Sequence, residues 1–337
     1  MQYKILGKTG LKVSALGLGG IPVQRITKEE AKALLEYLSQ NGVNFIDTAR
    51  GYTVSEEYLG YALSGGLREK YIIATKSMAR SYSDMARDID ISLANLNTDY
   101  IDLYQLHNPR TEADLELVFS ENGAMRALLE AKSAGKIKHI GATAHSADTL
   151  EKLMTHSEIE TVMFPFNIVE NQGFSAMDTA AEKNIGFIAM KPLAGGNIES
   201  GHLAVRYCLS DKRCTVAIPG MATIDEARAN ISAANDLSPL TDDEKTEIEK
   251  IQTELSGDFC RRCGYCAPCS VGIDIPTCFV MQGYLEHYDL AEWGRARYLA
   301  MKVTASACIG CGKCEQRCPY NLPIREKLKK TVEVFGV

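Results

Sequence analysis

The sequence predicts an α/β protein, in which a barrel of eight parallel strands, each followed by a helix, precedes a small, mainly helical, cysteine-rich domain. Two observations support this fold class. Short apolar runs alternate with amphipathic stretches eight times before residue 235, and eight strands close a parallel barrel of about 250 residues. The composition then changes, because nine of the eleven cysteines follow residue 259. We therefore expect residues 1–256 to form the barrel and residues 257–337 the second domain.

The chain begins with a short hairpin within residues 1–12, which is expected to close one end of the barrel. The pair Thr27 and Glu30 has capping-box spacing, so the first helix should begin there and run to about Gln40. The apolar runs predict strands at 14–19, 43–47, 71–76, 100–106, 137–143, 161–164, 185–190 and 214–218.

The stretches between and after these strands predict helices near 27–40, 55–63, 84–95, 123–134, 146–155, 174–183, 201–209 and 224–234. A further helix should run to about Leu255, and residues 276–302 predict two more. A doubly wound open sheet is the structural alternative. It is disfavoured because no Gly-rich phosphate turn follows the first strand.

Composition and charge exclude several function classes. The net charge of -6 gives no electrostatic basis for binding nucleic acid. With neither a signal-peptide pattern nor a long uncharged apolar run, we expect a cytoplasmic protein that makes no membrane contact. Cysteines clustered in such a chain favour metal binding over disulfides.

Three successive predicted strands end on side chains suited to acid–base chemistry, namely Asp47, Lys76 and His107. Parallel strands of a barrel present these ends on one face, where barrel enzymes place their catalytic residues, and Tyr52 follows in the first loop above them. Tyrosine is a poor acid because its ordinary pKa is about 10, but a nearby ammonium stabilises the tyrosinate and lowers that pKa. Each residue alone would more often be a cap, a buried polar group or a surface residue. Together they favour a site that protonates an oxygen as a hydride reaches the adjoining carbon.

The segment 44–49, with Tyr52 and then Ser55-Glu56, resembles the signature of the aldo-keto reductases. The resemblance covers residues 1 to about 235 and implies a (β/α)8 TIM barrel, an NADPH or NADH cofactor and a small-molecule carbonyl substrate. It assigns the general acid to Tyr52 and the tuning of that tyrosine to Lys76. It also implies that Asp47 holds the lysine and that His107 orients the carbonyl.

The same resemblance implies nicotinamide-cofactor contacts, with departures from the family pattern. Ala144 lacks the amide that many members use for the nicotinamide, and Met163 stands where many have glutamine. Met190 replaces the usual stacking aromatic, although its thioether adapts to such a role or simply to core packing. The implied contacts are Thr143, His145, Met190, Lys191, Pro192, Leu193, Gly195, Gly220 and Asn230.

The preference between NADH and NADPH stays open. Residues Gly220, Met221 and Glu226 stand where many NADPH-using members have Lys, Ser and Arg. A 2′-phosphate needs cations, so Glu226 would repel it and Arg228 is the residue available to compensate. The segment 191–196, with a lysine and two glycines, suits a pyrophosphate or is a flexible loop.

The tail carries two cysteine runs, and the spacing of the second, with its final Cys318-Pro319, is that of bacterial ferredoxins. The tail thus predicts two [4Fe–4S] clusters in a ferredoxin-like domain, each taking three cysteines from one run and one from the other. Zinc is the competing metal, and Cys278 is a spare ligand. One predicted set is Cys260, Cys263, Cys266 and Cys318, and the other is Cys269, Cys308, Cys311 and Cys314.

We therefore expect an NAD(P)H-dependent carbonyl reductase that carries two clusters. Hydride transfer moves two electrons at once and does not require the clusters. Three alternatives follow. The clusters could couple the nicotinamide or a substrate to a one-electron partner such as ferredoxin or flavodoxin, or they could be structural and clamp the tail over the barrel mouth. In the third, the barrel is a non-enzymatic redox sensor.

Overall fold

The computed structural model describes all 337 residues and divides them into two compact units. The predicted boundary near residue 256 lies inside unit 2, because helix α10 (Asp242–Leu255) groups with the residues that follow it. No helix is long and apolar enough to cross a membrane. Unit 1 contains Met1–Asn167, Asn171–Leu193 and Ser200–Leu240, and unit 2 contains Ile168–Glu170, Ala194–Glu199 and Thr241–Val337.

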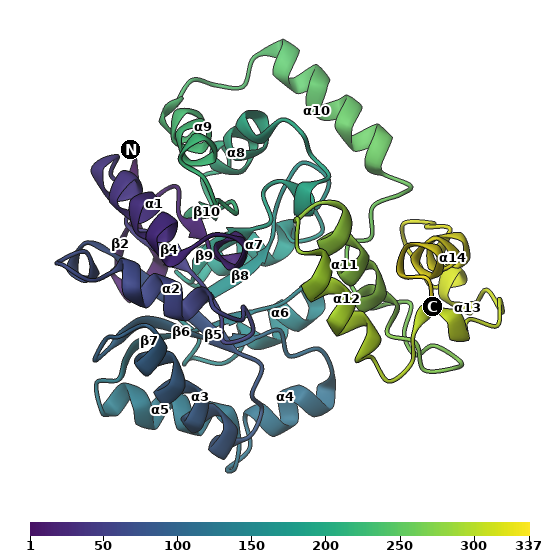
Figure 1. The fold of residues 1–337 in the computed structure, drawn as a ribbon, viewed down its shortest axis with the longest axis horizontal. Helices are drawn as coiled ribbons and strands as arrows, with labels where there is room; N and C mark the ends of the chain where they lie inside the picture. Colours follow the sequence, from purple (N-terminus) through teal and green to yellow (C-terminus); the bar gives the residue numbers. More distant parts are fainter. The chain divides into compact units, whose positions relative to one another are not determined.

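Unit 1 is the predicted (β/α)8 TIM barrel, with helices around a ring of parallel strands (Figure 1). The strands follow one another in chain order, and parallel bridges from Leu16 to Ala217 and from Gly19 to Gly220 join the two edges of the sheet. The strands are β3 (Leu18–Gly19), β4 (Phe45–Asp47), β5 (Ile72–Ser77), β6 (Ile101–His107), β7 (Ile137–Thr143), β8 (Thr161–Pro165), β9 (Gly186–Met190) and β10 (Val216–Ile218).

The predicted helices are all present. The hydroxyl of Thr27 caps the first, and Glu30 completes the predicted capping box. A short helix, α4 (Glu112–Val118), was not predicted, because Val118 is its only buried residue and it shows almost no apolar periodicity. The others are α1 (Lys28–Gln40), α2 (Ser55–Ala62), α3 (Tyr82–Asn95), α5 (Ala124–Ser133), α6 (Ala147–Leu153), α7 (Phe174–Glu182), α8 (Gly201–Ser210) and α9 (Ile224–Asn235).

An antiparallel hairpin of β1 (Tyr3–Ile5) and β2 (Lys12–Ser14) lies at the start of the strands, as predicted. Its Leu6 and Val13 belong to the same apolar cluster as Phe45 and Ile188 of the barrel strands. The N–H of Lys8 donates to the carbonyl of Asn184, just before β9, at 2.6 Å. The N-terminal ends of the strands are therefore closed by apolar packing, which leaves the C-terminal ends for polar chemistry.

Unit 2 is mainly helical, with a small core around Cys278, Tyr298 and Phe335. The two helices predicted within residues 276–302 are present, and the rings of Tyr298 and Phe335 stack at 3.8 Å. The last helix was not predicted, although Leu328 on its inner face is buried. The helices of unit 2 are α10, α11 (Ile275–Glu286), α12 (Ala291–Leu299), α13 (Lys313–Gln316) and α14 (Ile324–Phe335).

Candidate active site and metal centres

The barrel places Asp47, Lys76 and His107 at or next to the C-terminal ends of the adjacent strands β4, β5 and β6. The Nζ of Lys76 donates to Oδ2 of Asp47 at 2.5 Å and to the carbonyl of Thr48 at 2.8 Å. Both side chains of this pair are almost fully buried. Two acceptors therefore set the position of the lysine ammonium.

Burial acts in opposite directions on the two partners. Loss of solvent raises the pKa of Asp47 above its usual value, against the attraction of Lys76 and the hydrogen bonds from Lys76 and Gln105. Loss of solvent lowers the pKa of Lys76, against the attraction of Asp47 and Glu56. Each charge thus depends on its partner, and the loss of either would leave the other charge buried and uncompensated.

Tyr52 lies in the loop between β4 and α2, beside this pair. The Nζ of Lys76 is 5.0 Å from the centre of the tyrosine ring, within range of a cation–π contact. The ring of His107 meets that of Tyr52 edge-on, with centroids 6.3 Å apart and an interplanar angle of 89°. Tyr52 and His107 are partly exposed, so a substrate can reach these two members of the group.

Two further buried residues support this group and were not predicted as site residues. Gln105 donates from Nε2 to Oδ1 of Asp47 at 3.2 Å. It lies two residues before His107 on β6. Since side chains alternate between the faces of a strand, this spacing could have indicated that Gln105 and His107 share one face. Glu56 accepts hydrogen bonds from Thr75 and Arg50 at 2.8 and 3.0 Å, and it favours the charged form of Lys76.

The residues expected to contact the nicotinamide cofactor lie mostly at the C-terminal ends of strands. Thr143 ends β7, and its Oγ1 accepts the N–H of Asn108 at 3.0 Å. Met190 ends β9 and belongs to the same apolar cluster of the barrel core as Met163. Of the others, His145 precedes α6, Lys191, Pro192 and Leu193 leave β9, Gly220 follows β10, Asn230 is buried in α9, and Gly195 belongs to unit 2.

Glu226 has a structural role that the capping pattern Thr223-x-x-Glu226 would have indicated. Its carboxylate accepts the backbone N–H groups of Ala222 and Thr223 at the start of α9. It also pairs with Arg25 at 3.3 Å, whereas Arg228 pairs with Asp225 at 2.5 Å. The charge that was expected to repel a 2′-phosphate is therefore partly neutralised by Arg25, and Arg228 is engaged elsewhere.

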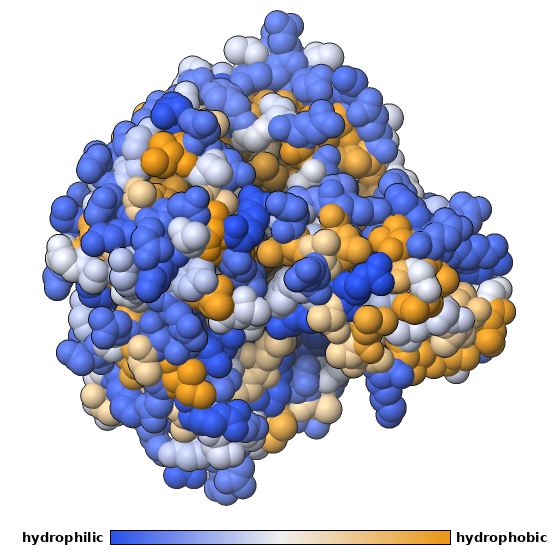
Figure 2. All heavy atoms as spheres, in the orientation of Figure 1, coloured by the Kyte–Doolittle hydropathy of each residue, from blue (hydrophilic) through white to orange (hydrophobic).

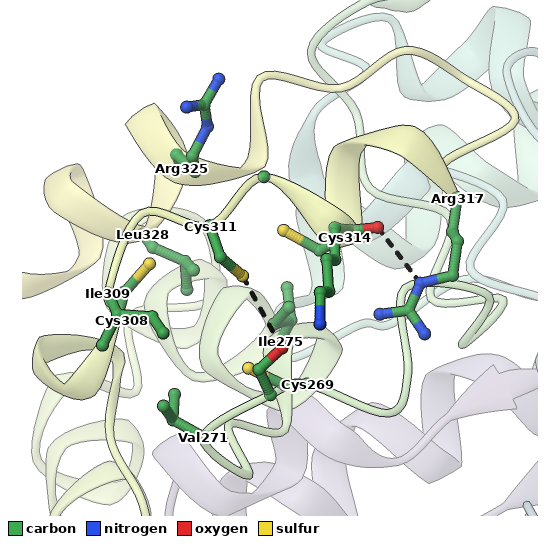
Figure 3. Close-up of a pocket in the computed structure, with 13 residues that line it drawn as sticks. Cys269, Val271, Ile275, Cys308, Ile309, Cys311, Cys314, Arg317, Arg325 and Leu328 are labelled. Atoms are coloured by element: carbon green, nitrogen blue, oxygen red, sulfur yellow. Dashed lines mark hydrogen bonds between the residues drawn. The ribbon is translucent and has the colours of Figure 1, made fainter.

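The eight cysteines of the two runs line two separate cavities in unit 2. Figure 3 shows the thiols of Cys269, Cys308, Cys311 and Cys314 around one of them. Each cavity takes three cysteines from one run and one from the other, which is the grouping that the spacing predicted. The other cavity is lined by Cys260, Cys263, Cys266 and Cys318. We call this one the first cavity, because three of its cysteines come from the first run, and the cavity around Cys311 the second cavity.

These donor sets suit iron–sulfur chemistry, because a [4Fe–4S] cluster binds through four cysteine thiolates. The spare candidate, Cys278, is fully buried and lines neither cavity. Nowhere do three His, Cys, Asp or Glu side chains converge closely enough to bind a single metal ion.

Two arginines of the first cysteine run contact residues 168–170, which also belong to unit 2. Arg262 donates from one nitrogen to both carboxylate oxygens of Glu170 at 2.6 and 2.7 Å, and Glu170 is fully buried. The Nε of Arg261 donates to the carbonyl of Val169 at 3.1 Å. Since residues 168–170 follow β8 closely in the chain, unit 2 includes part of the loop that leaves the barrel strand.

Comparisons with known proteins agree with both halves of the chain. The model of the aldo/keto reductase family matches residues 15–202, and that of the 4Fe-4S dicluster domain matches residues 259–323. L-galactose dehydrogenase of Arabidopsis thaliana is 27% identical, over 74% of this chain and 94% of its own length. The uncharacterized oxidoreductase YqkF of Bacillus subtilis is 25% identical, over 77% of this chain and 98% of its own length.

Solved structures show the same fold. A Pseudomonas aeruginosa protein described as an aldo-keto reductase has a TM-score of 0.62 and 27% identity, covering 69% of this chain and 94% of its own. The holo form of a Bacillus halodurans aldo-keto reductase has a TM-score of 0.65 over 74% of this chain and 96% of its own. Its identity of 24% supports the fold alone.

Proposed function

Because this chain belongs to the aldo/keto reductase family, we propose that it reduces the carbonyl group of a small aldehyde or ketone at the expense of NADPH or NADH. The observation that carries the proposal is the buried ion pair of Lys76 and Asp47 directly beside the partly exposed Tyr52. This arrangement suits the protonation of an oxygen that becomes negative during reduction.

The residues of the chain have distinct roles in this reaction. The nicotinamide cofactor, when bound, supplies the hydride that the carbonyl carbon receives. Tyr52 donates its hydroxyl proton to the carbonyl oxygen, so the product is an alcohol. The Lys76 ammonium stabilises the resulting tyrosinate, and Asp47 keeps that ammonium charged and oriented. His107, edge-on to Tyr52, orients the carbonyl by a hydrogen bond to its oxygen.

The cofactor would be held by the residues at the ends of β7, β9 and β10 that the family resemblance implies. Thr143 offers a hydroxyl there, and Lys191 offers a cation at a backbone position of positive φ, a conformation found in turns that bind anions. Arg25 makes NADPH acceptable despite Glu226, because it offsets the carboxylate. We therefore propose that both NADH and NADPH are used.

The two cysteine-lined cavities would each hold one [4Fe–4S] cluster, which supplies one-electron chemistry when bound. A second candidate function follows, in which the protein exchanges electrons with a one-electron partner such as ferredoxin or flavodoxin. It is favoured by one observation. Cys311, in the second cavity, is exposed, so a partner protein can approach that centre closely.

The test uses the anaerobically purified, cluster-loaded protein. Oxidation of NADPH and NADH is followed by absorbance with a panel of small aldehydes and ketones, and turnover is expected at about 1–10³ per second. A carbonyl-dependent rate that is lost in Lys76→Met supports the reductase proposal. If no carbonyl is reduced while either nicotinamide reduces the clusters by EPR, the electron-exchange function replaces it.

A further inference from the structure

The loop between Cys308 and Lys313 exposes part of the second cysteine-lined cavity. Ile309 is 67% exposed and Cys311 is exposed, whereas none of the four cysteines of the first cavity is. Apolar surface gathers over the region of α13 and α14 in Figure 2, next to hydrophilic residues. A donor of electrons can thus approach the second set of ligands, through Cys311, more closely than the first set, whose cysteines are buried or only partly exposed.

The two cavities differ in what else they touch within unit 2. The first is lined by Arg261 and Arg262, and these bind Val169 and Glu170 of the loop that follows β8. The second is lined by the exposed loop around Ile309. The second cavity is therefore the more exposed of the two, and we call it the outer cavity, with an outer centre, and the first the inner cavity.

The rim of the outer cavity and of the groove beside it is basic. Four cationic residues and two carboxylates line them, in a chain whose net charge is -6. One cation, Arg325, is neutralised by Glu315 at 2.8 Å. No carboxylate pairs with the other three cations, Lys313, Arg317 and Lys329. Arg317 donates only to backbone carbonyls, and the two lysines form no ion pair.

We infer that this rim, formed by Ile309, Lys313, Arg317 and Lys329, is the docking surface for an acidic one-electron carrier protein. The inference rests on the proposed cluster ligation by Cys269, Cys308, Cys311 and Cys314. The cations attract the acidic carrier, and Ile309 supplies an apolar contact that excludes water at the point of closest approach. Small, charged contacts of this kind are typical of transient electron-transfer complexes.

The redox step is a single-electron exchange. One electron leaves the reduced carrier, which is oxidised by one unit, and enters the outer centre, which is reduced by one unit. No bond forms or breaks and no proton moves. The carrier therefore needs only brief contact, which a rim of a few cations is enough to provide.

The experiment mixes the oxidised, cluster-loaded full chain with a reduced acidic plant-type [2Fe–2S] ferredoxin in an anaerobic stopped-flow instrument. The second-order rate is measured against salt concentration for the wild type and for Lys313→Glu/Lys329→Glu. The control, Lys250→Glu/Lys302→Glu, has the same change in charge, in unit 2, outside the linings of the cavity and groove. Iron content and the rate of reduction by dithionite show whether each variant keeps its clusters, and binding of the oxidised ferredoxin is measured by calorimetry.

The inference predicts a rate that falls steeply with salt and is at least about tenfold lower in Lys313→Glu/Lys329→Glu than in the control. Calorimetric affinity should fall in parallel, while reduction by dithionite is unchanged. The inference is wrong if ferredoxin reduces the wild type only at a slow rate that does not depend on salt. It is also wrong if the rate of reduction falls equally in Lys313→Glu/Lys329→Glu and in the control. NAD(P)H-linked carbonyl reduction is measured on the same samples, so that a failure of the reductase proposal is seen separately from a failure of the docking surface.

Discussion

The ion pair between Arg262 and Glu170 allows a quantitative prediction, because both side chains are removed from water. Glu170 is fully buried and the side chain of Arg262 is 11% exposed. The variant Glu170→Gln keeps the shape of the side chain but removes its charge. A guanidinium does not lose its proton in proteins, so Arg262 becomes a buried cation without its hydrogen-bonded carboxylate. Removing one partner of a buried pair costs about 3–5 kcal/mol, and we expect Glu170→Gln to lose about this much.

The loss should be local to unit 2, in which residues 168–170 and the first cysteine run both lie. Hydrogen exchange of the cluster-loaded protein, followed by mass spectrometry, measures the free energy of opening in each segment. Peptides that span residues 165–173 and 259–264 should exchange about a hundredfold faster in the variant, which corresponds to about 3 kcal/mol.

Two further variants provide the controls. Glu315→Gln removes an ion pair of the same unit that lies at the surface, and it should leave exchange almost unchanged. The double variant Glu170→Gln/Arg262→Met removes both buried charges and should recover most of the lost protection, which gives the coupling between them. Exchange in Glu170→Gln that matches Glu315→Gln would refute the reasoning.

Three further predictions concern the barrel. Lys76→Met should lower kcat for carbonyl reduction at least about a hundredfold, as expected when a general acid loses its activating charge, and steady-state kinetics will measure this. Arg25→Ala should raise KM for NADPH more than KM for NADH, because it exposes a 2′-phosphate to the charge of Glu226; an equal change would contradict this. Burial raises the pKa of Glu160, but hydrogen bonds with His139 and two further donors outweigh it and lower the pKa to about 2. Because its pKa is lower in the folded state, the ionised Glu160 stabilises the fold fully above its unfolded pKa of 4.5 and progressively less as the pH falls towards 2. The difference in Tm between wild type and Glu160→Gln should therefore be largest at neutral pH and shrink below about pH 4.

Local patterns account for what could be predicted about the barrel and its site. Strand spacing and apolar runs predicted the eight strands, and a polar residue at three strand ends predicted where Asp47, Lys76 and His107 lie. Gln105 was missed although strand alternation places it on the same face as His107, because its amide was given no chemical role.

Long-range packing accounts for what could not be predicted. Nothing local in residues 168–170 indicates that they join unit 2, since their partners Arg261 and Arg262 lie about ninety residues further along the chain. Gly196, likewise in unit 2, lies against His287, and an added Cβ would approach that side chain to 2.7 Å. The short helix α4 buries only Val118, so it carries too weak a periodicity to be recognised.

The most direct measurement of the central claim is a comparison of Tyr52→Phe with wild type in single-turnover oxidation of NADPH by a reducible aldehyde. Tyr61→Phe, which removes an exposed hydroxyl from α2, is the matched control. If Tyr52 is the proton donor, the rate falls by about 10²–10⁴ in Tyr52→Phe alone, while the affinity for NADPH is unchanged. A rate within a few-fold of wild type would show that the proton comes from elsewhere and that the proposed mechanism is wrong.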